Sequence, residues 1–264
     1  MIKIQLPLTP SKKTRSHSVI KRAAHSSILP STFPITLNLN FEDFTPSTMR
    51  GKHILVLGAT GRLGTQVVNQ ALEASYHVTA LVRSDSNLPF TRYQLRNPNL
   101  VIRVGSVLSR SDLDKVMEGQ DAVINCIGPR LFNNNDIDIC SRSQQYIIDS
   151  MIHNEVRRLI AVSLQGVGHS NPRLSSMQKF FGRLFSGKIL DDKEIQENLI
   201  KKYSDKIDWT IVRPGKLFNG RLTHQWKLND DLSYTKISRA NVACFIMKEL
   251  RSSAWLKQTL TINS

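Results

Sequence analysis

The sequence is poor in cysteine and has no long apolar run. Its 264 residues include three cysteines, Cys126, Cys140 and Cys244, whose spacing matches no zinc motif and whose odd number argues against a disulfide framework. No stretch reaches the roughly 18 uncharged apolar residues that a membrane-spanning helix needs. We therefore expect a protein of a reducing compartment, with no metal site and no transmembrane segment.

Acidic residues are also scarce relative to basic ones. There are 21 Asp and Glu against 36 Lys and Arg, so the formal net charge is +15. A basic protein favours anionic ligands such as phosphates, nucleic acid or anionic lipid surfaces. No aromatic–basic motif and no helix-turn-helix pattern is present, so we expect no nucleic-acid partner. The 40% hydrophobic content excludes a wholly disordered chain.

Residues 1–48 differ in composition from the rest of the chain. They contain no acidic residue before Glu42, are rich in Ser and Thr, and carry six basic residues. Such a segment is typical of an organelle-targeting presequence or a disordered tail. A third explanation is the choice of start site, because Met49 opens the compact run MRGKHILVLG. We expect a cytoplasmic protein, or one of an organelle stroma or matrix if residues 1–48 are a transit peptide.

Beyond residue 52, short apolar runs alternate with segments of helical periodicity. Such alternation is typical of a parallel sheet covered on both faces. The sequence therefore predicts an α/β fold, a doubly wound parallel sheet, over residues 49–264. The strands are predicted over 53–57, 77–82, 100–104, 122–127, 158–163, 209–212 and 259–262, and the helices over 62–74, 111–118, 137–154, 189–203 and 238–250.

Three finer predictions follow from this pattern. Ser111 is expected to cap the helix over 111–118, and Tyr146 to lie on the buried face of the helix over 137–154. The segments 164–188 and 216–235 interrupt the alternation. Because ligands of doubly wound folds bind outside the carboxyl ends of the strands, we expect these segments to form a small substrate-side region.

The sequence GATGRLG, Gly58 to Gly64, follows the first predicted strand and opens the first predicted helix. Small residues let the backbone turn sharply and approach a pyrophosphate closely. The N-terminus of the helix adds oriented N–H groups and a partial positive charge. The strand–turn–helix context makes this motif a prediction of dinucleotide binding rather than of a structural turn.

Arg83 directly follows the second predicted strand. An acidic residue at this position binds the ribose 2′-hydroxyl of NAD, whereas a guanidinium pairs with the 2′-phosphate of NADP and stacks on adenine. We therefore predict a preference for NADP(H), to which Arg62 in the turn contributes. The alternative is an ordinary solvated arginine.

With these motifs, residues 52–264 resemble the atypical short-chain dehydrogenases/reductases, especially the NAD(P)H-binding NmrA-like proteins and the biliverdin reductase B (flavin reductase) type. Further matches are DAVINCIG at 121–128, VSLQGVG at 162–168 and DWTIVRPGKL at 208–217. The resemblance implies a Rossmann fold that binds NAD(P)H. It implies pyrophosphate contacts at Gly58, Thr60, Gly61, Arg62, Leu63 and Gly64, and a 2′-phosphate contact at Arg83. Adenine would be contacted by Ser106 and Val107. Cys126, Ile127 and Gly128 would lie below the ribose, and Pro214 and Gly215 beside the nicotinamide.

The sequence departs from the main line of that superfamily in its proton-transfer residues. Main-line members use Tyr-x-x-x-Lys, but no tyrosine here is followed four residues later by lysine. The resemblance leaves two catalytic candidates: Ser163, near the nicotinamide, and Lys193, which would reach the nicotinamide ribose. A third candidate is His169, in the substrate-side loop. Lys193 and Glu197 are spaced i, i+4, so the alternative for them is a pair on the helix surface.

The resemblance without the Tyr–Lys dyad implies an NADP-dependent oxidoreductase. Hydride would pass from NADPH to a flat conjugated acceptor such as a flavin, quinone or tetrapyrrole, with solvent supplying the proton. The missing dyad and the basic surface also suit a non-catalytic NADP(H)-binding sensor or assembly factor with a protein partner. Epimerase or isomerase chemistry on a nucleotide sugar is disfavoured, because in related folds it relies on the missing tyrosine.

Overall fold

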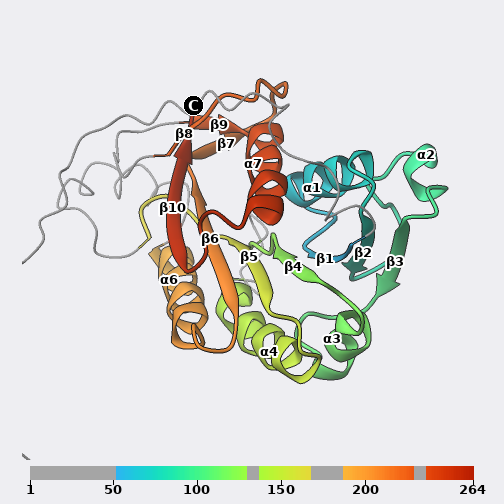
Figure 1. Ribbon diagram of the computed structural model, residues 1–264, viewed down its shortest axis with the longest axis horizontal. Coiled ribbons are helices and arrows are strands. Elements are labelled where there is room, and N and C mark those ends of the chain that lie inside the picture. Colours follow the sequence, from blue (N-terminus) through green and yellow to red (C-terminus); the bar gives the residue numbers. More distant parts are fainter. Residues whose placement is uncertain (1–51, 130–136, 168–186, 229–235) are drawn as a thin grey trace, which may run out of the picture. The chain divides into compact units, whose positions relative to one another are not determined.

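The computed structural model describes residues 52–129, 137–167, 187–228 and 236–264. The strands of its main sheet are β1 (His53–Leu57), β2 (His77–Val82), β3 (Leu100–Val104), β4 (Ala122–Asn125), β5 (Arg158–Val162), β6 (Asp208–Pro214), β8 (Lys227–Leu228) and β10 (Gln258–Asn263). Within the described ranges they form one eight-stranded sheet in the order β3-β2-β1-β4-β5-β6-β10-β8 (Figure 1). Every neighbouring pair is parallel except β10 with β8. The predicted doubly wound sheet is confirmed, with an antiparallel strand added at one edge.

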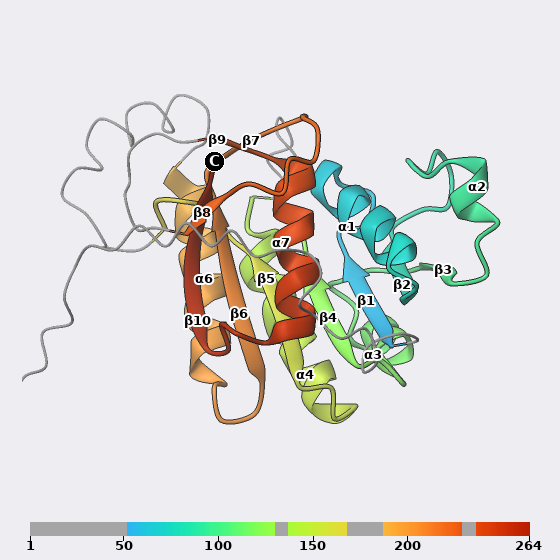
Figure 2. The ribbon, with the colours of Figure 1, turned by 45° about the horizontal axis from the view of Figure 1, so that its top comes forward.

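Helices cover both faces of the sheet (Figure 2). They are α1 (Arg62–Glu73), α3 (Arg110–Met117), α4 (Ile139–His153), α6 (Gly187–Lys202) and α7 (Arg239–Ser252), with a short α2 (Arg92–Leu95) between β2 and β3. Successive side chains of β1 point to opposite faces. Ile54 and Val56 pack with α1 and α7, whereas Leu55 and Leu57 pack with α3 and α4. Continuous apolar strands thus supply two cores at once.

The edge strand β3 is more exposed than the central strands. Val101 is 38% and Val104 60% exposed, because no strand pairs with β3 on its outer side within the described residues. The expected strand is present, pairs with β2, and packs Leu100 and Ile102 against the core. Its place at the edge was not predicted, since the order of strands in a sheet depends on long-range packing.

Two predictions about helices are wrong. Helix α3 begins at Arg110, and its N-cap is Ser109, whose side chain accepts a hydrogen bond from the backbone N–H of Asp112. Ser111 is therefore inside the first turn and not the cap. Tyr146 is 41% exposed, because Ile147 and Met151 occupy the inward face of α4.

The segment after β6 contains a second, small sheet. Strand β7 (Lys216–Phe218) pairs in parallel with β9 (Lys236–Ser238), while β8 joins the edge of the main sheet. The sequence pattern predicted none of these short strands. The predictions for residues 1–48, for His169 and for most of 164–188 lie outside the described residues. In the described part of the chain, the search for a helix with the length and hydropathy of a membrane span finds none.

Candidate functional site

The residues expected to bind the cofactor come from the carboxyl ends of neighbouring parallel strands. The turn 58–64 follows β1, Arg83 follows β2, Ser106 and Val107 follow β3, residues 126–128 follow β4, Ser163 follows β5, and Gly215 follows β6. In a parallel sheet these ends lie along one edge. The strand order reverses between β1 and β4, and this switch point is where doubly wound folds bind ligands. The fold therefore brings the described candidates to a single edge of the sheet.

Two glycines of the turn are required by close backbone contacts. Gly58 has φ +74°, and a Cβ there would lie 2.8 Å from the backbone carbonyl of Cys126. A Cβ on Gly64 would overlap the carbonyl oxygen of Gly58. The turn can therefore pack this tightly between β1, β4 and α1 only with glycine at both positions.

The N-terminus of α1 is arranged to receive an anion. Its N-cap, Gly61, has no side chain to cap the helix, and the first turn has no acidic residue. The first N–H groups of a helix lack intrahelical partners and carry the positive end of its dipole. Thr60, Gly61 and Arg62 are exposed, whereas Leu63 and Gly64 are buried. A pyrophosphate fits this turn through backbone N–H groups.

Thr65 directly follows the glycine turn, and the sequence motif did not single it out. Its hydroxyl lies 2.9 Å from the carbonyl oxygen of Gly61 and 3.2 Å from that of Ala59, and donates within the turn. This side chain holds the backbone of the turn from inside the helix. The sequence feature that could have indicated this residue is a threonine or serine directly after the last glycine of the turn.

Three arginines accompany this end of the sheet. Arg83 is exposed directly after β2, and Arg62 is exposed in the turn. Arg239, which sequence analysis did not single out, begins α7, and α7 packs against α1 (Figure 2). Burial and then the like charge of Arg62 lower the pKa of Arg239 below its ordinary value. Two cations near each other, one of them at a helix N-terminus, are unfavourable unless an anion lies between them.

The loop after β3 uses Ser106 as a structural residue. The hydroxyl of Ser106 accepts the N–H of Leu108 at 3.1 Å, and the backbone N–H of Ser106 donates to the Asp112 carboxylate at 3.0 Å. Asp112 comes from the first turn of α3. The carboxylate of Asp112 thus lies beside the loop that follows β3.

Lys193 lies under the ends of β4 and β5 and is 2% exposed. Its ammonium donates hydrogen bonds of 2.9 Å to the carbonyl oxygens of Ile127 and Val162 and to the side chain of Gln196. An ammonium group has three N–H donors, so all three are used. Lys193 thereby ties together the ends of two strands. The predicted alternative of a surface pair with Glu197 is wrong, because both side chains are buried.

Ser163 belongs to a second buried polar cluster. Its hydroxyl donates to Glu197 at 2.6 Å, and Arg213 of β6 forms two hydrogen bonds with the same carboxylate, at 2.8 and 2.6 Å. Burial raises the pKa of Glu197, but the hydrogen bonds and charge of Arg213, together with Ser163 and Lys201, outweigh it and hold the pKa below its ordinary value. Glu197 is therefore ionised at neutral pH and fixes the orientation of the Ser163 hydroxyl.

The remaining candidates act through their backbone. Burial raises the pKa of the Cys126 thiol to about 12, so this group stays protonated and unreactive. The N–H of Gly215 donates to Ile262, which joins the end of β6 to β10. Gly128 is exposed, with open space where a Cβ would be.

Comparison with known proteins settles the family. The sequence profile of the NAD(P)H-binding family matches residues 58–253. The chain belongs to the NAD(P)H-binding family. The resemblance inferred from the motifs is thereby confirmed at this level, and the match includes the glycine turn, the β2 end and the buried Lys193 and Glu197.

Two curated relatives of this NAD(P)H-binding protein match over part of their length. The photosystem II assembly factor Ycf39 of Cyanidium caldarium is 25% identical over 112 residues, which is 42% of this chain and 35% of the relative. The decarboxylating sterol-4-alpha-carboxylate 3-dehydrogenase of Bos taurus is 31% identical over 91 residues, which is 34% of this chain and 23% of the relative. The matched stretches thus span about a third of one relative and a quarter of the other.

Solved structures match over most of their length. The oxidoreductase ylbE of Lactococcus lactis has a TM-score of 0.69 at 18% identity, covering 80% of this chain and 90% of that one. ChuY of Escherichia coli O157:H7, an anaerobilin reductase, has a TM-score of 0.66 at 21% identity, covering 80% and 97%. A short-chain dehydrogenase/reductase of Veillonella parvula in complex with NADP has a TM-score of 0.66 at 17% identity, covering 81% and 94%. At these identities the likeness establishes the fold.

Proposed function

We propose that this protein is an NADP-dependent oxidoreductase that reduces a flat conjugated acceptor, such as a flavin, a quinone or a tetrapyrrole. The observation that carries the proposal is the glycine turn at the N-terminus of α1, with Arg62 and Arg83 beside it. The turn suits the pyrophosphate and the arginines suit a 2′-phosphate. NADPH would supply the hydride, and the acceptor would take a proton from solvent.

The protein's own residues would hold the cofactor and the acceptor in position and would not transfer protons. All three donors of Lys193 are used by Ile127, Val162 and Gln196. We therefore propose that Lys193 is a positioning residue that holds the ends of β4 and β5. Ser163 would offer an oxygen fixed by Glu197 toward the nicotinamide end, and Pro214 and Gly215 would border it. Such a site accelerates hydride transfer mainly by proximity and orientation.

Two likenesses support the choice of reaction. ChuY, which shares the fold, is an anaerobilin reductase, and the Veillonella parvula protein of the same fold binds NADP. Glycine at positions 128 and 215 would leave a flat acceptor free of side-chain bulk at these two positions. We further propose that segments 164–188 and 216–235 contribute the acceptor side.

A second candidate is an NADP(H)-binding assembly factor or sensor without turnover. The specific observation for it is that Lys193 and Ser163 are both engaged in buried hydrogen bonds, so neither of these two candidates is a free proton donor. The partial match to the assembly factor Ycf39 points the same way. Such a protein would change its affinity for a protein partner when NADPH binds.

Steady-state oxidation of NADPH, followed by its absorbance with a panel of flavins, quinones and linear tetrapyrroles, distinguishes the two. Turnover with one acceptor class, faster with NADPH than with NADH, supports the oxidoreductase. Tight NADPH binding without turnover on the whole panel overturns it, and a partner retained only with NADPH then supports the assembly factor. Gly64→Ala is the matched inactive control, because it disrupts the turn in either case.

A further inference from the structure

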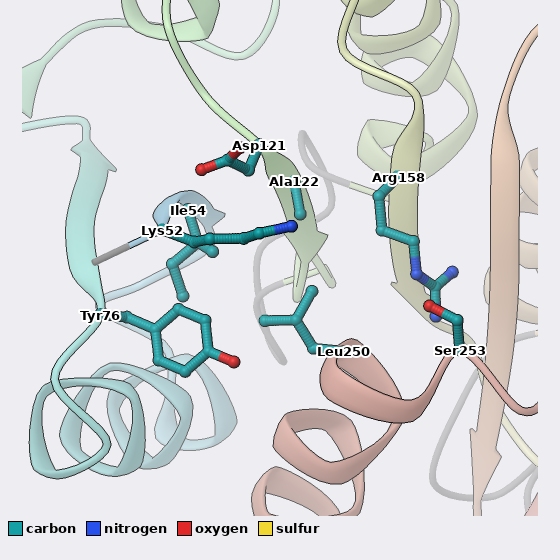
Figure 3. A pocket seen from close by; sticks show the side chains of 8 residues that line it. All are labelled: Lys52, Ile54, Tyr76, Asp121, Ala122, Arg158, Leu250 and Ser253. Atoms are coloured by element: carbon teal, nitrogen blue, oxygen red, sulfur yellow. The ribbon is translucent and has the colours of Figure 1, made fainter. Parts of the chain in front are cut away.

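A cavity of about 130 Å³ lies at the amino-terminal edge of the sheet, where the strands begin rather than where they end. Figure 3 shows its lining, which we call the amino-terminal pocket. Lys52 precedes β1, Tyr76 precedes β2, Asp121 precedes β4 and Arg158 begins β5, while Leu250 and Ser253 close it from the end of α7. This pocket belongs to the edge opposite the candidate cofactor site.

Two donors of the pocket are buried without a hydrogen-bond partner among the described residues. One is the hydroxyl of Tyr76, a residue that is 1% exposed, and the other is Nε of Arg158. Burial raises the pKa of Tyr76, although the charge of Arg251 opposes this, so the phenol keeps its proton. Buried polar groups in folded proteins nearly always have a partner. Nε of Arg158 can only donate, so its missing partner is an acceptor, and the Tyr76 hydroxyl can donate as well.

Lys52 of the pocket forms no salt bridge with an acidic residue within the described parts of the chain. Asp121 accepts the backbone N–H of His53 at 2.8 Å, and its carboxylate points away from the Lys52 ammonium in Figure 3. Arg158 pairs with Glu249 at 2.7 Å, and Glu249 also accepts from Thr210. Glu249 is thus engaged with Arg158, and one oxygen of Asp121 is held by His53, while the Asp121 side chain still lines the pocket. Lys52, the Tyr76 hydroxyl and Nε of Arg158 contribute donors to one cavity, and the last two have no hydrogen-bond acceptor among the described residues.

We propose that the amino-terminal pocket binds a small oxyanion, a phosphate or a carboxylate. Its oxygens would accept from the Lys52 ammonium, the Tyr76 hydroxyl and Nε of Arg158. A water molecule occupies about 30 Å³ of liquid, so the cavity has room for an ion of several non-hydrogen atoms. Hydrogen bonds from a cation and from neutral donors to an oxyanion are the strong, charge-assisted kind. The site is independent of the proposed hydride transfer.

The test is a titration of the full chain with inorganic phosphate and, separately, with acetate, at constant ionic strength and saturating NADP. The NADP keeps the glycine turn occupied, so that phosphate does not report on it. Melting temperature and calorimetric binding are measured for the unaltered protein, Lys52→Met and Tyr76→Phe. Lys115→Met and Tyr93→Phe, both at exposed positions, are the matched controls.

The expected result is saturable stabilisation by one of the two anions, which identifies its class. Each pocket variant should weaken the binding about tenfold or more, and the two controls should leave it unchanged. An equal response of all five proteins, or no response to either anion, overturns the proposal. A Tyr76→Phe variant that is more stable than the unaltered protein at every anion concentration also overturns the proposal. In that case the Tyr76 hydroxyl would make no hydrogen bond to the anion that the substitution could remove. If Lys52→Met does not fold, Tyr76→Phe alone decides.

Discussion

The hydroxyl of Ser163 lies 2.6 Å from a carboxylate oxygen of Glu197, and both side chains are buried at the carboxyl end of β5. Glu197 in turn forms two hydrogen bonds with Arg213, so a strand end, a helix and the neighbouring strand share one charge cluster. Against the effect of burial, Arg213 holds the Glu197 carboxylate ionised with a lowered pKa, which makes it a weak base for activating Ser163, whereas a fixed hydroxyl can orient a ligand. The three side chains link the end of β5 to α6 and β6.

Glu197→Gln should lower the free energy of unfolding by roughly 3 kcal/mol at pH 7, because the half-buried Arg213 loses its counterion. The pKa of Glu197 is depressed in the folded state, so its contribution is present above its ordinary value of 4.5 and is lost as the pH falls through the folded value. Urea denaturation at pH 7 and below pH 4 should therefore show the difference between the two proteins shrinking in acid. Glu73→Gln, at an exposed position, should show no such pattern. A difference that is independent of pH would contradict the assignment.

Gly64→Ala should destabilise the fold and weaken NADPH binding, because the new Cβ overlaps the carbonyl oxygen of Gly58. Overpacking of this kind costs about 1–3 kcal/mol. Chemical denaturation and fluorescence titration with NADPH measure the two effects. Gly187→Ala is the control, since open space surrounds that position at the start of α6, and it should be neutral or slightly stabilising. Unchanged NADPH affinity in Gly64→Ala would exclude the turn as the pyrophosphate site.

Arg83→Ala should lower the affinity for NADPH by about tenfold to a hundredfold, because a charge-assisted hydrogen bond to the 2′-phosphate is lost. The affinity for NADH, which has no 2′-phosphate, should stay the same. Isothermal titration with both cofactors measures the ratio. The control is Arg251→Ala, in the last turn of α7, which should leave both affinities unchanged. Equal affinities of the unaltered protein for NADPH and NADH would remove the basis for the role of Arg83.

Lys193→Met should destabilise the protein by about 2–4 kcal/mol, because the carbonyl oxygens of Ile127 and Val162 lose a buried donor. Since Lys193 is proposed to hold strand ends and not to transfer a proton, the pH profile of turnover by the folded variant should match that of the unaltered protein. Denaturation curves and pH–rate profiles provide both readouts. Lys188→Met, exposed on the same helix, is the control. A stable variant whose profile loses one limb would assign Lys193 to proton transfer instead.

The thiol of Cys126 should resist alkylation in the native protein at pH 8, because a pKa of about 12 leaves almost no thiolate. Burial also raises the pKa of Cys140, to about 11. Mass spectrometry after iodoacetamide treatment should find both unmodified without urea and fully modified in urea. Rapid native labelling of Cys126 would mean that the end of β4 is open to solvent and that the thiol is a candidate for chemistry.

Much of the fold and part of the site could be predicted from sequence because their signals are local. Apolar runs placed the seven main parallel strands, and GATGRLG identified the turn between β1 and α1 before any contact was known. The close approach of Gly64 to Gly58 explains why such a motif is readable at all: the geometry tolerates no other residue. Edge exposure of β3 and the outward direction of Tyr146 were not readable, since apolar residues on an edge strand or a helix face look the same in sequence.

What the sequence by itself determined is therefore the parallel α/β alternation, the phosphate-binding turn and the presence of Arg83 after the second strand. Only the tertiary structure decided that Arg239 lies near Arg62, that Lys193 uses all its donors on two strand ends, and that Glu197 is paired with Arg213 rather than exposed. These relationships join residues far apart in the chain, and their energies arise from burial and charge pairing. Local sequence periodicity does not predict these contacts, because they form only when the strands and helices pack.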